Sequence, residues 1–156
     1  MMKRNKFWTY AACILLPLAV GGLSALFTAK GMPAYQALIK PPLTPPSLVF
    51  PIVWSLLYVL MGVGAARVRL AAPARAKGAM AAFALQLALN FFWSLWFFGL
   101  QWRLFAFLWL LLLLAAVLLM IRTFVPLDPP AARLQVPYLL WLAFAAYLNL
   151  AIWLLN

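Results

Sequence analysis

Three apolar stretches of the chain carry aromatic, amide and small side chains at helical spacing, so that in each stretch they share one helical face. The members are Trp54, Ser55 and Tyr58 in the first stretch, Gln86, Asn90, Trp93, Ser94 and Phe97 in the second, and Tyr138, Trp141, Ala145 and Asn149 in the third. Uncharged side chains of these types can line an apolar pocket in which a few polar groups orient a ligand. The flat aromatic faces favour a flat, hydrophobic ligand.

Other kinds of chemistry are excluded by what the chain lacks. Its 156 residues include no histidine, one cysteine (Cys13) and one acidic residue (Asp128). A Cys/His metal site, a nucleophile with a histidine base and a pair of carboxylates therefore cannot form within one chain. We predict no metal, no required cofactor and no conventional catalytic residue, and we interpret Cys13 as a small packed residue.

The composition indicates that these stretches lie in a membrane. Hydrophobic residues make up 69% of the chain and charged residues only 8%. Five apolar runs are long enough to cross a bilayer core of about 30 Å as helices. We place them at 7–29, 47–66, 79–100, 104–124 and 134–155, which predicts an all-α membrane protein, a five-transmembrane-helix bundle in one domain spanning 1–156. The first run exceeds a signal-peptide core of about 7–15 residues, so we interpret it as a retained span.

Two of the runs and one connection differ from the rest. The fourth run has no residue more polar than Trp109 between Leu104 and Ile121, which indicates a lipid-facing or packing helix. The first run is nearly as plain, apart from Ser24 and the pair Gly21 and Gly22. The connection 30–46 is rich in proline, which removes backbone donors, so we expect it to cover one membrane surface as a lid.

Basic residues are distributed unequally between the two sides of the predicted bundle. One side carries Lys3, Arg4, Lys6, Arg67, Arg69, Arg75, Lys77, Arg122 and Arg133, and the other carries Lys30, Lys40 and Arg103. The excess predicts a cytoplasmic N-terminus, with Asn156 and the first loop on the opposite side. The net charge of +11 is then explained by contact with lipid headgroups, and we predict no nucleic-acid partner.

Two structural interpretations remain beside ligand binding. Amide side chains in membrane helices often bond to a neighbouring helix, which accounts for Asn90 equally well. The pairs Gly78 with Ala82 and Ala84 with Ala88 are small residues spaced four apart on the third helix. They permit a homodimer through that helix, and packing within the protomer explains them equally well.

Several motifs, in order along the chain, resemble the TspO/translocator protein family, whose members are also called tryptophan-rich sensory proteins or peripheral-type benzodiazepine receptors. They are Lys40-Pro41-Pro42, Thr44-Pro45-Pro46, Phe50-Pro51-Ile52-Val53-Trp54, Gln86-Leu87-Ala88-Leu89-Asn90, Pro129-Pro130-Ala131-Ala132-Arg133 and Pro137-Tyr138 with Trp141. The resemblance implies a five-helix homodimer in a bacterial membrane, with a pocket closed by the first loop. It also implies binding of porphyrins such as protoporphyrin IX and haem. The pocket positions that it implies are Tyr35, Pro45, Trp54, Tyr58, Asn90, Trp93, Trp141 and Ala145.

The chain departs from the family pattern in its lid. Ala34 and Leu43 stand where the family often has tryptophan, which removes two aromatic surfaces. No basic residue follows Tyr147, so we do not predict cholesterol specificity. We expect a membrane receptor or sensor for porphyrins and other flat hydrophobic ligands. Two alternatives stay open: facilitative transport of such ligands, and light-dependent porphyrin degradation, which the resemblance links to Trp54 and Trp141.

Overall fold

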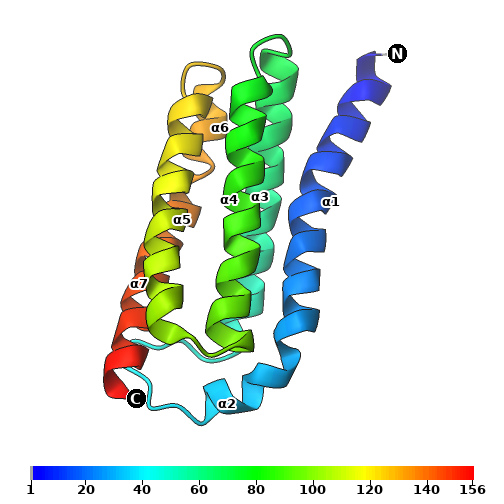
Figure 1. Ribbon diagram of the computed structural model, residues 1–156. Coiled ribbons are helices and arrows are strands. Elements are labelled where there is room, and N and C mark those ends of the chain that lie inside the picture. The colour runs from blue at the N-terminus through cyan, green and yellow to red at the C-terminus, as the bar shows by residue number, and fades with distance from the viewer. Residues whose placement is uncertain (1) are drawn as a thin grey trace.

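The computed structural model describes residues 2–156 and consists of helices and their connections, with no strand in that range (Figure 1). Five of its helical segments are long and apolar enough to cross a membrane. The helices are α1 (Met2–Thr28), η1 (Ala29–Gly31), α2 (Met32–Gln36), α3 (Val49–Ala71), α4 (Lys77–Ser94), the π-helical turn η2 (Leu95–Gly99), α5 (Arg103–Phe124), α6 (Pro129–Arg133) and α7 (Val136–Leu155). The predicted fold class is confirmed.

The long helices run up and down through the bundle (Figure 1). The N-terminus and the α3–α4 and α5–α6 connections lie at one end, and α2, the first loop and the C-terminus lie at the other. Along their lengths, α1 packs mainly on α3, and both α4 and α7 pack mainly on α5. Segments of the first loop and the C-terminal residue, far apart in sequence, therefore meet at the same end.

Some boundaries differ from those predicted. The second span was expected to end at residue 66, with Arg67 and Arg69 in a loop, but α3 continues to Ala71. Arg67 forms an ion pair with Asp128, Nε to Oδ2 at 2.7 Å, which fastens this last part of α3 to the start of α6. The fifth span was expected to begin at 134; instead, α6 is a separate short helix and α7 begins at Val136. The predicted loop 30–46 overlaps η1 and contains α2.

A close backbone approach joins α1 to α3. A β-carbon placed on Gly62 would overlap the backbone of Cys13 and Ile14. Pro17 lies inside α1 and cannot donate a hydrogen bond to the carbonyl of Cys13, so this carbonyl is free to face α3. Cys13 itself is buried, as predicted.

Helix α5 forms a packing wall, as its plain sequence indicated. One face of α5 is fully buried in the bundle, and it consists of Ala106, Leu110, Leu113, Val117, Met120 and Phe124. The opposite face exposes leucines, among them Leu111 and Leu112, where lipid would surround a spanning helix. This helix contributes no residue to the cavity described next.

Candidate ligand-binding cavity

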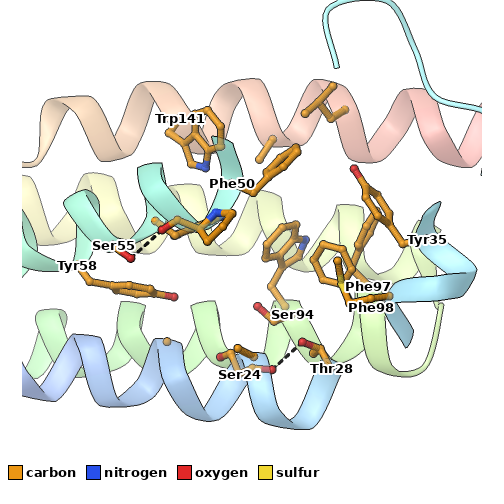
Figure 2. A pocket seen from close by; sticks show the side chains of 18 of the residues that line it. Ser24, Thr28, Tyr35, Phe50, Ser55, Tyr58, Ser94, Phe97, Phe98 and Trp141 are labelled. Atoms are coloured by element: carbon orange, nitrogen blue, oxygen red, sulfur yellow. Dashed lines mark hydrogen bonds between the residues drawn. The ribbon is translucent and has the colours of Figure 1, made fainter. Parts of the chain in front are cut away.

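A cavity of about 400 Å³ lies between α1, α2, α3, α4 with η2, and α7 (Figure 2). Its volume falls within the range of about 300–1,000 Å³ that is usual for small-molecule sites. Its surface is mainly apolar and rich in rings. The aromatic residues that line it are Tyr35, Phe50, Trp54, Tyr58, Trp93, Phe97, Phe98 and Trp141.

Trp54 stands at the centre of these rings. Its ring centroid is 5.6 Å from that of Tyr58 on the same helix and 6.2 Å from that of Trp93 on α4. The ring of Trp93 stacks on Phe97 at 5.8 Å. On the other side, Phe50 meets Trp141 of α7 edge-on at 5.9 Å. The walls contributed by α3, α4 and α7 are therefore aromatic surfaces in mutual contact, and such offset contacts hold the rings in defined orientations.

Asn90 lies behind this wall. Its Oδ1 accepts a hydrogen bond from the hydroxyl of Tyr58 at 3.2 Å, and its Nδ2 donates to Oη of Tyr138 at 2.7 Å. Tyr138 in turn donates to Oε1 of Gln86 at 2.8 Å. Asn90, Gln86 and Tyr138 are buried and do not line the cavity. The amides of Asn90 and Gln86 thus form interhelical hydrogen bonds, and Asn90 orients Tyr58, which does reach the cavity.

A second amide links three helices at the other end of the wall. The indole Nε1 of Trp93 donates to Oδ1 of Asn149 at 3.1 Å, and Nδ2 of Asn149 donates to the carbonyl of Arg103 at 2.8 Å. Trp93 and Asn149 both line the cavity. Their bond fixes the Trp93 ring relative to α7 and to the start of α5.

Helix α1 supplies a wall that the sequence did not predict. Ser24 and Thr28 face the cavity from α1, across from Trp141 on α7 (Figure 2). Gly21 also lines it, and a β-carbon there would overlap the ring of Tyr58. The only signals in the sequence were Ser24 and the glycine pair, because small residues do not form a recognisable stripe.

Two buried polar atoms on the cavity wall have no hydrogen-bond partner within residues 2–156. They are Oγ of Ser24 and Nε1 of Trp141. Buried polar groups are usually paired, so both atoms are available for a hydrogen bond to a ligand. The other α1 hydroxyl, that of Thr28, is already bonded to the carbonyl of Ser24 at 2.7 Å.

The first loop closes the cavity with an aromatic side chain. Tyr35 of α2 is buried and meets the rings of Phe97 and Phe98 edge-on at 6.0 and 5.2 Å. Nζ of Lys40 lies 5.0 Å from the centroid of the Tyr35 ring. A β-carbon on Gly31 would overlap the carbonyl of Phe98, so the beginning of the lid rests directly on η2.

The rest of the lid is fastened to α7. The backbone N–H of Ile39 donates to Oδ1 of Asn156 at 3.0 Å, and the carbonyl of Ile39 accepts from Nδ2 of Asn156 at 2.8 Å. The hydroxyl of Tyr147 donates to the carbonyl of Pro42 at 3.0 Å. These bonds join two segments that are more than 100 residues apart in the sequence.

The structure brings most of the expected pocket residues together. Those that line the cavity are Tyr35, Trp54, Tyr58, Trp93, Trp141 and Ala145. Asn90 does not line the cavity and lies behind Tyr58. Pro45 is a half-buried lid residue that does not line the cavity either. Leu43, at one of the positions where the family often has tryptophan, is exposed and has a positive φ of 72°.

Five apolar helices, four of which line an aromatic cavity that a docked loop closes at one end, define a multi-pass α-helical membrane protein with an internal cavity. Residues 13–154 match the sequence model of the TspO/MBR family, and the chain belongs to this family. The resemblance found in the motifs is thereby confirmed.

Relatives of this chain are found in bacteria and in animals. It is 40% identical to "Tryptophan-rich protein TspO" of Chlorobaculum tepidum over 153 residues, which cover 95% of this chain and 96% of the relative. It is 37% identical to "Translocator protein" of Bos taurus over 143 residues, or 89% and 85% of the two chains. It is 36% identical to "Tryptophan-rich sensory protein" of Cereibacter sphaeroides over 151 residues, or 96% and 90%.

Proposed function

We propose that this protein is a membrane receptor or sensor that binds porphyrins, such as protoporphyrin IX and haem, and other flat hydrophobic ligands in the cavity. The observation that carries the proposal is the convergence of Trp54, Trp93 and Trp141 from three helices on one cavity of about 400 Å³. The family includes proteins named as sensory and as translocator, which fits a ligand-binding role.

The cavity offers a ligand both flat contacts and polar ones. A porphyrin plane would lie against the indole faces, whose burial and ring contacts supply most of the affinity. Nε1 of Trp141 would donate to a ligand acceptor and Oγ of Ser24 would form a second hydrogen bond, because neither atom has a partner among the described residues. Lys40 beside Tyr35 places a cation at the lid end, where it would favour a ligand carboxylate.

Binding is tested by titrating the reconstituted protein with protoporphyrin IX and following the absorbance of the ligand, so that loss of a tryptophan does not remove the signal. We expect Trp54→Ala and Trp141→Ala to weaken binding by about 2 kcal/mol, or about 30-fold, as is usual for buried aromatic anchors. Trp153→Ala is the matched control, because Trp153 lies on α7 outside the cavity. Equal affinity in all three variants and the wild type would show that the cavity is not the site.

Facilitative transport of the same ligands is a second candidate, favoured by the relative named "Translocator protein". No acidic side chain lies on the cavity wall, and proton-coupled transport usually relies on one, so any transport would be passive. Uptake of protoporphyrin IX into proteoliposomes down a gradient, compared with empty vesicles, tests this candidate.

Light-dependent porphyrin degradation is a third candidate, favoured by the position of Trp54 and Trp141 on the cavity wall. The oxidant would be dioxygen, and the protein would bind and orient the pigment. Illumination of the complex in air should then yield a new pigment, and Trp141→Phe should reduce its yield. The same spectrum before and after illumination would exclude this activity.

We further propose a homodimer through α4 in a bacterial membrane, with the N-terminus in the cytoplasm. Of the pair Gly78 and Ala82, Ala82 is buried and packs within the protomer, whereas Gly78 is exposed with open space around it. Ala84 and Ala88 are exposed and leave a flat helix face for a second copy. Crosslinking in mild detergent should capture a dimer in the wild type and lose it in Ala84→Leu.

A further inference from the structure

A second hollow lies on the outer surface of the bundle between α3 and α7. Its volume is about 480 Å³, and its walls are apolar side chains, among them Leu56, Leu57 and Leu60 of α3 with Leu140 and Phe144 of α7. Leu56 and Leu140 are 61% and 65% exposed, on a surface that lipid would cover in a membrane. Because α3 packs mainly on α1, and α7 packs mainly on α5, the backbones of α3 and α7 do not come close enough to each other to fill this space.

Trp141 belongs to both the hollow and the inner cavity. Its ring contacts Phe50 at 5.9 Å on the cavity side and Phe144 at 5.6 Å on the side of the hollow. Its Nε1 has no hydrogen-bond partner within residues 2–156. The wall between the hollow and the inner cavity therefore includes the Trp141 indole, which is held by ring contacts and by no hydrogen bond.

The lid end of the cavity is closed more firmly. Asn156 holds both backbone groups of Ile39, Tyr147 holds the carbonyl of Pro42, and Tyr35 is buried against η2. Passage there would require several hydrogen bonds to break together. It would also take an apolar ligand through water, which is unfavourable in proportion to its apolar surface.

We propose that the hollow between α3 and α7 is a lateral portal through which a flat hydrophobic ligand passes between the bilayer and the cavity, with the Trp141 indole as its gate. The proposal rests on the proposed function, because it concerns the route of the same ligand. A ligand dissolved in the hydrocarbon would enter the hollow without leaving an apolar environment. Rotation of one side chain would then admit it to the cavity.

The test measures exchange rates and affinity separately. Proteoliposomes are mixed with vesicles that contain protoporphyrin IX, and uptake and release are followed by rapid mixing. Leu140→Trp and Leu56→Trp fill the hollow with a larger side chain. Leu112→Trp is the matched control, because Leu112 is 51% exposed on α5, away from the hollow.

We expect both portal variants to slow uptake and release by about tenfold, which corresponds to a barrier higher by about 1.4 kcal/mol. The equilibrium affinity should stay unchanged, because the bound and free states are the same. Leu112→Trp should exchange like the wild type. Folding of each variant is checked independently of affinity, by the cooperative unfolding of its helices in denaturing detergent. Leu140→Phe replaces any variant that is not folded.

Two results would overturn the portal. One is wild-type exchange in both filled variants, which would leave the lid as the route. The other is faster release with weaker affinity, which would make the hollow part of the binding site. If the wild-type protein binds no protoporphyrin IX at all, the proposed function fails instead, so the two failures are distinguishable.

Discussion

The hydrogen-bonded group of Tyr58, Asn90, Tyr138 and Gln86 gives the sharpest test of how the cavity is built. Asn90→Ala removes the acceptor for Tyr58 and the donor to Tyr138. Interhelical hydrogen bonds in membrane proteins contribute about 0.6 kcal/mol each on average and up to about 1.7 kcal/mol. The two bonds together therefore predict a loss of about 1–3 kcal/mol in the free energy of unfolding. Tyr58→Phe removes only the 3.2 Å bond and should cost about 0.6 kcal/mol.

The assay is reversible unfolding in mixed micelles with increasing denaturing detergent, combined with titration of protoporphyrin IX. A double-mutant cycle between Tyr58→Phe and Asn90→Ala should give a coupling energy of about 0.6 kcal/mol, because the two side chains share one bond. Ser55→Ala is the control, since its hydroxyl bonds only to the carbonyl of Pro51 in the same helix, and its stability should equal that of the wild type.

Ligand affinity separates positioning from direct contact. Asn90 reaches the cavity only through Tyr58, so Asn90→Ala should weaken porphyrin binding less than Trp54→Ala does. The reasoning is refuted if Asn90→Ala leaves the stability unchanged and weakens binding as strongly as Trp54→Ala. Such a result would mean that the amide contacts the ligand and not the two tyrosines.

Three further predictions concern the lid and the helix contacts. Asn156→Ala should speed hydrogen exchange at the Ile39 amide by about tenfold, because the two hydrogen bonds between Asn156 and Ile39 are lost. Tenfold corresponds to a local loss of about 1.4 kcal/mol. Unchanged exchange would mean that these two bonds do not hold the lid. Gly62→Ala should lower the free energy of unfolding by about 1–3 kcal/mol, because the added methyl group meets the α1 backbone. Gly78→Ala should not lower it, because Gly78 has open space around it. Equal effects of the two substitutions would contradict the close approach of α1 and α3. Asp128→Asn should lower stability at low salt and less at high salt, because its Arg67 partner is partly exposed; a salt-independent effect would point away from the ion pair.

The sequence by itself determined the five spans and much of the aromatic wall. Run lengths of about 20 apolar residues reflect the thickness of the bilayer and need no knowledge of neighbours. The plain sequence between 104 and 121 likewise predicted the packing wall of α5. Periodicity placed Trp93 and Trp141 on defined faces of their own helices, because it is a property of one helix alone.

Only the tertiary structure decided which side chains meet across helices. Asn90 carries the same pattern whether its amide faces a ligand or two tyrosines, and only the positions of α3 and α7 assign it to Tyr58 and Tyr138. The wall formed by α1 was hidden because Gly21 and Ser24 contribute space and one hydroxyl, not a stripe of rings. The link from Asn156 to Ile39 depends on two chain segments ending at the same side of the bundle. Contacts of this kind depend on the distance between helices, which the spacing of residues along a single helix does not contain.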